Sequence, residues 1–216
     1  VFMSDNGMNC GHHGIWGKGN GTRPQNMYDT SVKVPCIVAQ PGRIAAGQVS
    51  HAMLSGYDMF PTLVDYLGIA DHGDGRRKPG RSFRGVLEGN ANPADGAVVV
   101  YDEYGPVRML RTADWKYVHR HPQGPHELFD LAADPGERHN LVDNPQLADR
   151  VGTLRARLQD WFNLYVDPAR DGADKGVTGC GQLGRVEDAS AGHPAFADQH
   201  LVGADWDLWL ARDGVK

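Results

Sequence analysis

The sequence predicts an α/β protein in which strand, helix and loop units are followed by a small antiparallel sheet with a covering C-terminal helix. Three observations support this fold class. An apolar run over residues 1–3 leads directly into a glycine-rich segment over residues 7–30. Three short strand-like stretches lie between residues 97 and 121, and a strongly periodic helix follows from residue 145.

The N-terminal part, residues 1–92, is expected to contain two buried strands and two helices. Residues 1–3 are typical of the end of a central parallel strand that is apolar on both faces, and residues 32–39 of a second buried strand. Residues 58–67 predict a helix that is capped by Asp58 and ended by Gly68, and residues 83–87 a shorter helix. The apolar residues of the first helix share one face at helical spacing: Met59, Phe60, Leu63, Val64 and Leu67.

The middle part, residues 93–166, predicts an antiparallel meander and its covering helix. Strands are expected over residues 97–104, 107–112 and 115–121. Asn144-Pro145 is typical of a helix start, with asparagine as the cap and proline in the first turn. Apolar residues then step by threes and fours: Leu147, Val151, Leu154, Leu158, Trp161 and Tyr165. Residues 167–216 are expected to form an irregular wrapping extension, anchored by Trp206, Leu208 and Trp209.

The composition excludes several classes of function. The 216-residue chain has 40% hydrophobic residues and a net charge of −5, with no basic excess to suggest a nucleic-acid partner. No apolar stretch approaches the roughly 18 residues that span a bilayer. Three cysteines without CxxC spacing predict free buried or semi-buried thiols rather than disulfides or a zinc site. The chain opens on Val1, inside what resembles a buried strand, so we expect further protein upstream and no location can be assigned.

The residues with the clearest chemical meaning lie in the segment SDNGMNCGHHGIWGKGNG. Asp5 and Asn6 supply oxygen donors at a strand end, where Gly7 permits the backbone to turn, and such donors suit a hard divalent cation. Lys18, flanked by glycines, suits an anion bound beside that cation. His13 is the better placed of two loop histidines. The alternatives are a plain Asp-Asn-Gly turn, a solvated lysine and two ordinary loop histidines.

Other polar groups favour ordinary structural roles. His119, His121 and His126 form a histidine-rich patch without a nearby carboxylate to complete a metal site. Asp130 and Asp134 do not match the twelve-residue calcium loop, so a turn at Asp134-Pro135 is expected. Three further residues before the second strand suit either the pocket or the surface: Tyr28, Asp29 and Lys33.

Several motifs in order resemble the C-terminal half of a type I sulfatase, a family of the alkaline-phosphatase superfamily. They are SDNG, HHG, GKG and MYDTSVKVPCIVAQPG, then SGYDMFPTLVDYLGI, RMLRTADWKYV and ELFDLAADPGERHNLVDNP, spread over roughly residues 1–165. The resemblance implies a partial alkaline-phosphatase-like core. It also implies that Asp5 and Asn6 bind Ca²⁺ or Mg²⁺, that Lys18 holds a sulfate oxygen, and that His13 lies near the pocket.

The chain departs from this family at the nucleophile. Type I sulfatases use a formylglycine made from a C/S-x-P-S/A-R motif, and Cys10, Cys36 and Cys180 all lie in other contexts. The paired N-terminal aspartates, and the histidine and lysine of the family's first half, are also absent from this sequence. The resemblance therefore implies a sulfatase whose nucleophile lies upstream, and an isolated chain that is inactive. A phosphonate or phosphodiester hydrolase and a catalytically inert module are the alternatives.

The expected partners follow from the same reading. The substrate is expected to be a small sulfate ester or a sulfated carbohydrate, selected by loops at residues 71–80 and after residue 167. The apolar edge at residues 1–3 also predicts that the isolated chain self-associates.

Overall fold

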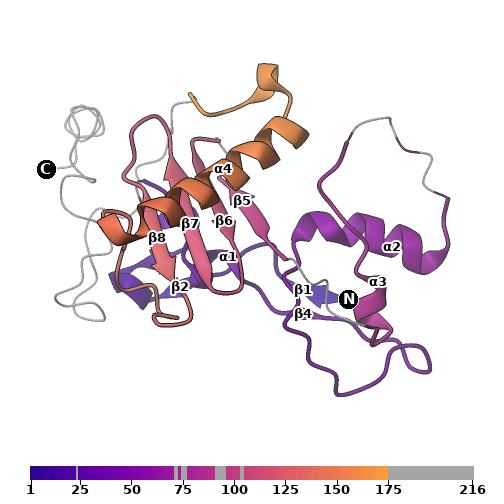
Figure 1. The fold of residues 1–216 in the computed structure, drawn as a ribbon. Helices are drawn as coiled ribbons and strands as arrows, with labels where there is room; N and C mark the ends of the chain where they lie inside the picture. The colour runs from indigo at the N-terminus through magenta and orange to yellow at the C-terminus, as the bar shows by residue number, and fades with distance from the viewer. Residues whose placement is uncertain (23, 71–72, 74–76, 91–95, 103–104, 175–216) are drawn as a thin grey trace, which may run out of the picture.

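The computed structural model describes residues 1–22, 24–70, 73, 77–90, 96–102 and 105–174. Figure 1 shows a four-stranded sheet with the long helix α4 lying across one face, and the remaining N-terminal elements beside and behind it. Half of the predicted 71–80 loop, residues 71–72 and 74–76, lies outside the described residues. The extension from residue 175, with Trp206, Leu208, Trp209 and Cys180, also lies outside them.

The sheet is an antiparallel meander, as the sequence predicts, but it has a fourth strand. Its strands pair in chain order: β5 (Val98–Tyr101), β6 (Val107–Arg111), β7 (Trp115–Arg120) and β8 (Glu127–Asp130). The fourth strand was not predicted, because it is four residues long and runs directly into a turn-rich segment. Tyr117 lies opposite Leu110 on one side and Leu128 on the other, which fixes the register.

Helix α4 (Ala148–Tyr165) covers one face of this sheet, which confirms the predicted covering helix. A 3₁₀ turn, Pro145–Leu147, precedes it, and the Asn144 side chain accepts the Gln146 N–H at 3.0 Å as a cap. The buried helix residues are spaced by four, and Phe162 takes the buried position whereas Trp161 packs at its margin. Together they form the main core: Leu154, Leu158 and Phe162 with Val99, Leu110, Tyr117 and Leu128.

The opposite face of the sheet packs against the segment before α1 (Asp29–Val32). Met27 is buried there with Val107, Met109 and Val118. Because side chains alternate along a strand, Tyr117 of β7 faces α4 while Lys116 reaches the Met27 carbonyl on the other side. The sheet is therefore enclosed between α4 and the N-terminal segment.

The two predicted N-terminal strands are shorter and more exposed than expected. Strand β1 (Phe2–Met3) pairs antiparallel, not parallel, with β4 (Cys36–Ile37), and within the described residues these two pair only with each other. Phe2 is 68% exposed and Ile37 59%. The first part of the predicted 32–39 strand is taken up by the end of α1.

The glycine-rich segment has more regular structure than a bare loop. A hairpin joins β2 (Asn9–Cys10) to β3 (Trp16–Gly17), with 3₁₀ turns at His12–Gly14 and Gly19–Gly21. Cys10 and Cys36 are free thiols but exposed, which corrects the predicted burial.

Helix α2 (Met59–Leu67) follows a 3₁₀ turn at Gly56–Asp58 and ends at Gly68 as predicted, with Gly68 at φ 66°. The Asp58 carboxylate does not cap the helix; it accepts the N–H groups of Ser55 at 2.8 Å and Arg81 at 2.9 Å. The predicted apolar face is largely exposed, with Phe60 at 57% and Leu67 at 62%.

Two short helical elements complete the description. Helix α3 (Arg84–Leu87) matches the predicted short helix, and a last 3₁₀ turn spans Pro168–Arg170. Across the described residues, no helix combines the length and apolar character needed to cross a membrane.

Candidate functional site

The turn after β1 presents Asp5 at the surface. The Asn6 N–H donates to Asp5 Oδ1 at 2.9 Å, and the Ser4 hydroxyl donates to the Asn6 carbonyl at 2.7 Å. The Asn6 N–H lowers the pKa of Asp5 most strongly, and the positive charge of Lys18 adds to this effect. Asp5 is therefore ionised at neutral pH, as a metal ligand must be.

Gly7 places this turn against α1. Its N–H donates to the Ser31 carbonyl at 2.9 Å, and a Cβ at this position would lie only 2.1 Å from the Thr30 carbonyl oxygen. The sequence suggested that Gly7 is needed for backbone freedom, but its φ is not in the left-handed region. Glycine is required here because the turn and α1 come into direct contact.

Lys18 follows β3 and is exposed. Its carbonyl accepts the Gly21 N–H at 2.9 Å and the Asn26 side-chain amide at 3.1 Å. The charge of Lys18 makes a small contribution to the lowered pKa of Asp5, after the hydrogen bonds from the Asn6 N–H and the Ser4 hydroxyl.

Three buried polar side chains, which the sequence reasoning did not identify, hold this segment in shape. Asn9 donates to the Gly17 carbonyl at 3.1 Å and to the Ser31 hydroxyl at 2.6 Å. The Ser31 hydroxyl donates in turn to Asn26 Oδ1 at 2.5 Å. Buried polar groups of this kind are stabilising only when they are paired, and here each has a protein partner. Their weak signal in the sequence is two asparagines within a glycine-rich segment.

His13 packs on Tyr28, whose ring in turn contacts Phe129 of β8. Its ring stacks on Tyr28 at 3.7 Å and 7°, and its backbone takes φ 55°. Burial lowers the pKa of His13 to about 4, and the charges of His12, Arg138 and Lys116 act in the same direction. His13 is consequently neutral at neutral pH.

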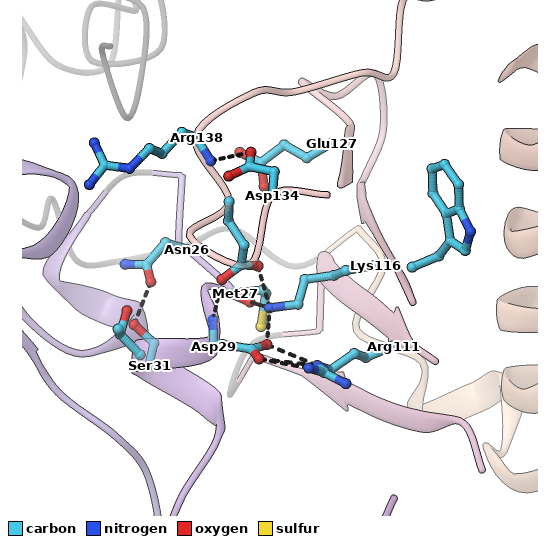
Figure 2. Close-up of polar contacts among 12 residues, drawn as sticks. Asn26, Met27, Asp29, Ser31, Arg111, Lys116, Glu127, Asp134 and Arg138 are labelled. Atoms are coloured by element: carbon cyan, nitrogen blue, oxygen red, sulfur yellow. Dashed lines mark hydrogen bonds and ion pairs between the residues drawn. The ribbon is translucent and has the colours of Figure 1, made fainter. Parts of the chain in front are cut away.

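A buried ion-pair cluster joins the N-terminal segment to the sheet (Figure 2). Lys116 Nζ lies 2.6 Å from Asp29 Oδ1 and 2.5 Å from Glu137 Oε1, and Arg111 Nη2 lies 2.8 Å from Asp29 Oδ2. Burial alone would raise the pKa of Asp29, but the hydrogen bonds from Arg111 and the charge of Lys116 outweigh it and lower the pKa to about 2. Asp29, left open between pocket and surface by the sequence, is thus an interior anchor.

The second histidine patch consists of His119 at the end of β7 and of His121 and His126, which follow that strand. The ring of His119 stacks on His126 at 4.3 Å and meets His121 edge-on at 4.5 Å, while the Tyr117 hydroxyl lies 3.0 Å from His119 Nδ1. Burial lowers the pKa of His119 to about 3. Among the residues that the structure describes, no three His, Cys, Asp or Glu side chains form a group suited to a metal ion.

The remaining candidates have structural partners. Asp130 Oδ1 accepts the N–H groups of Ala132 and Ala133, and Asp134 Oδ2 accepts those of Arg138 and His139, so both carboxylates stabilise turns. Tyr28 is buried and Lys33 is exposed.

Solved sulfatase structures share the fold of this chain, which is alkaline-phosphatase-like. A family model described as "N-sulphoglucosamine sulphohydrolase, C-terminal" matches residues 11–163, well over half of the chain. The chain belongs to this family, which confirms the resemblance seen in its motifs.

Curated relatives agree with this assignment. The chain is 32% identical over 179 residues to a Delta 4,5-hexuronate-2-O-sulfatase of Bacteroides thetaiotaomicron, covering 79% of this chain and 36% of that protein. It is 34% identical over 158 residues to a choline-sulfatase of Rhizobium meliloti, covering 72% of this chain and 29% of that protein. The chain spans about a third of the length of the curated relatives it matches.

Solved structures share the fold. One, described as a complex with its substrate D-glucosamine-2-N,6-O-disulfate, matches with a TM-score of 0.65 at 26% identity, covering 81% of this chain and 35% of that chain. A phosphonate monoester hydrolase of Agrobacterium radiobacter matches with a TM-score of 0.59 at 26% identity, covering 74% of this chain and 34% of that chain.

Proposed function

We propose that the protein containing this chain hydrolyses sulfate esters, and that this chain supplies supporting groups of the active site. The observation that carries the proposal is the membership of this chain in a sulfatase family, and the surface exposure of Asp5 and Lys18 supports it. Relatives are named for hexuronate-2-O and N-acetylglucosamine-6-O sulfates and for choline sulfate, so the proposed substrate is a sulfated carbohydrate or a small sulfate ester.

Asp5 and Asn6 are the proposed ligands of Ca²⁺ or Mg²⁺. Asp5 is ionised and exposed, and the two contacts to its carboxylate both involve Oδ1. A carboxylate beside an amide oxygen provides the hard donors that these ions prefer, although both ions take six or more ligands. The rest of the ligand set therefore comes from outside these two residues. The bound ion would polarise the ester oxygen.

Lys18 is the proposed contact for a sulfate oxygen, where its ammonium stabilises charge that develops on the leaving side. His13 is proposed to support the loop beside the pocket, as a neutral ring stacked on Tyr28. The nucleophile, expected to be a formylglycine, lies in sequence outside this chain. For this reason the isolated chain is proposed to be inactive.

The test uses p-nitrophenyl sulfate and the full-length protein. We expect turnover that stops on removal of divalent cations, returns with Ca²⁺ or Mg²⁺, and falls sharply in Lys18→Ala. Lys33→Ala, which removes another exposed ammonium, is the matched control and should behave as the wild type. Turnover by the isolated chain would contradict the proposed division of the site, and an inactive full-length protein would favour the inert module.

A phosphonate or phosphodiester hydrolase is the second candidate, because phosphonate monoester hydrolases are among the structures that share the fold. A metal ion with a neighbouring lysine also suits phosphoryl transfer. Comparison of kcat/KM for matched p-nitrophenyl sulfate and phenyl phosphonate esters separates the two. A preference for the phosphonate would reject the sulfatase assignment.

We also propose that the isolated chain self-associates through its exposed apolar edge. Val1 and Phe2 are 67% and 68% exposed beside Ile37, and an exposed strand pair offers unpaired backbone groups to a second copy. Light scattering of the isolated chain should give a mass above that of one chain. A monodisperse monomer at tens of micromolar would contradict this.

A further inference from the structure

A single buried ammonium lies behind both halves of the candidate site. Lys116 of β7 is 0% exposed, and its Nζ contacts the Met27 carbonyl at 2.9 Å, Asp29 Oδ1 at 2.6 Å and Glu137 Oε1 at 2.5 Å. The contacts to Met27 and Asp29 are hydrogen bonds, and the contact to Glu137 is an ion pair. Figure 2 shows Lys116 reaching from the sheet between Met27 and Asp29.

The first connection leads from Lys116 to Lys18. Met27, whose carbonyl binds Lys116, follows Asn26 directly. The Asn26 side-chain amide donates to the carbonyls of Lys18 at 3.1 Å and Gly19 at 3.3 Å, and its backbone N–H donates to Gly19 at 3.0 Å. Asn26 therefore holds the backbone of Lys18, and its neighbour Met27 is bound by Lys116.

The second connection leads from Lys116 to the proposed metal ligands. Asp29 begins α1, and its backbone N–H donates to Glu137 Oε2 at 2.6 Å while its carboxylate binds Lys116 and Arg111. The Gly7 N–H, directly after Asn6, bonds to Ser31 of the same helix at 2.9 Å. A shift of α1 would therefore move the Asp5-Asn6 turn.

The charges in this cluster balance, which makes the arrangement rigid. Two cations, Lys116 and Arg111, face two anions, Asp29 and Glu137, and all four are largely or fully buried. Removal of one partner from such a cluster leaves a buried charge uncompensated, which is strongly destabilising. Any test must therefore restore the charge balance.

We propose that Lys116, with Asp29, Glu137 and Asn26, forms a positioning centre that sets Lys18 and the Asp5-Asn6 turn relative to each other. These residues act through the groups that they hold and not on the substrate. The inference rests on the proposed role of Lys18 in binding the sulfate ester.

The main test compares two charge-balanced double variants of the full-length protein. Lys116→Met/Glu137→Gln removes the ammonium and one anion, and leaves Asp29 paired with Arg111. Arg108→Met/Asp171→Asn is the matched control, since it removes the ion pair between Arg108, buried on β6 with its guanidinium over Phe162 of α4, and the half-buried Asp171. Both variants are assayed at a temperature where circular dichroism shows them folded. We expect kcat/KM to fall ~10- to 100-fold in Lys116→Met/Glu137→Gln and under about 3-fold in the control. The reason is that displacement of a site group by ~1 Å lowers turnover by about 10²-fold.

A double-mutant cycle tests the connection to Lys18 directly. Asn26→Ala should lower kcat/KM about 10-fold in the wild-type background and less than about 2-fold in a Lys18→Ala background, because Asn26 is proposed to act through the position of the Lys18 ammonium, which the second background lacks. Equal effects in both backgrounds would overturn the inference.

The outcomes separate this inference from the proposed function. A strongly impaired Lys18→Ala enzyme beside a fully active Lys116→Met/Glu137→Gln enzyme would overturn the positioning centre alone. An unimpaired Lys18→Ala enzyme would overturn the proposed role of Lys18, and the inference with it. If the Lys116 double variant does not fold, the Asn26 cycle decides the matter by itself.

Discussion

Replacement of Gly7 by alanine should displace the proposed metal ligands. The new Cβ would lie 2.1 Å from the Thr30 carbonyl oxygen and 3.0 Å from its carbonyl carbon, and both obstacles are backbone atoms of α1. An ordinary contact begins near 3.4 Å, so the Asp5-Asn6 turn must retreat by about 1.3 Å. That movement also stretches the 2.9 Å hydrogen bond from the Gly7 N–H to Ser31.

Two magnitudes follow for Gly7→Ala. Overpacking of this kind costs about 1–3 kcal/mol, and loss of the hydrogen bond adds about 0.5–1.5 kcal/mol. Displacement of a site group by about 1 Å costs roughly 100-fold in turnover. We therefore expect the full-length variant to need much higher Ca²⁺ or Mg²⁺ for half-maximal activity and to lose most of its kcat/KM.

The assay is a divalent-cation titration of p-nitrophenyl sulfate turnover by the full-length protein. Gly56→Ala is the matched control, because a Cβ at Gly56 meets no atom within 4 Å and its φ is not in the left-handed region. The control should titrate as the wild type. If the Gly7→Ala enzyme has the cation dependence and kcat/KM of the wild type, then the contact of Gly7 with α1 does not determine the position of the Asp5-Asn6 turn.

Three further outcomes are expected for the isolated chain. Leu158 of α4 is buried in the main core, so Leu158→Ala should lower the free energy of unfolding by about 2–5 kcal/mol. Leu164→Ala, at a position 44% exposed on the same helix, should change it by less than about 1 kcal/mol. Equal losses of both variants in urea unfolding would contradict the packing of α4. Gly152→Ala should raise the thermal midpoint, since its Cβ meets nothing within 4 Å and alanine favours a helix over glycine by about 0.5–1 kcal/mol; a lower midpoint would count against this. Acid should also unfold the chain in part through His119. Burial lowers its folded pKa to about 3, below an unfolded value of ~6.5, so its contribution is complete above pH ~6.5 and is lost as the pH falls towards 3. His119→Gln should reduce the slope of unfolding free energy against pH by up to ~1.4 kcal/mol per unit between pH 6.5 and 4, and an unchanged slope would exclude this origin.

The sheet and α4 were predictable because their signals are local. Leu154 and Leu158 are spaced by four along one helix face, and the meander needs only neighbouring segments to pair. The strand β8 escaped prediction because four residues carry too little alternation to stand out beside the turn at Asp134. The same local logic located the 3₁₀ turn that Asn144 caps directly before α4, and the end of α2 at Gly68.

The N-terminal part was predicted less well because burial depends on distant partners. Apolar composition at Phe2, Ile37 and Phe60 indicates a surface suited to burial, but it does not say what covers that surface. In the described residues β1 and β4 have only one another, so their side chains remain exposed. Likewise, Asp58 has the residue type of a helix cap, but Ser55 is the cap of the preceding 3₁₀ turn, and Asp58 closes its capping box from the third position while its other oxygen accepts the Arg81 N–H.

The candidate site divides in the same way. Asp5, Asn6 and Lys18 were identifiable because their chemistry is written in one short segment. The groups behind them were not, since Lys116 meets Met27 across 89 residues and the Asp29 N–H meets Glu137 across 108. No periodicity or motif spacing predicts a contact between residues so far apart.

The contact between Asp29 and Glu137 also sets a time order for the maturation of this region. Adjacent strands of the meander can pair as soon as they are made, but the anchor of the glycine-rich segment must wait for a partner 108 residues later. At a synthesis rate of about 5–20 residues per second, that wait lasts roughly 5 to 20 s on the ribosome. The residues proposed to bind the metal and the sulfate are thus among the first to be synthesised in this chain and among the last to be fixed in place.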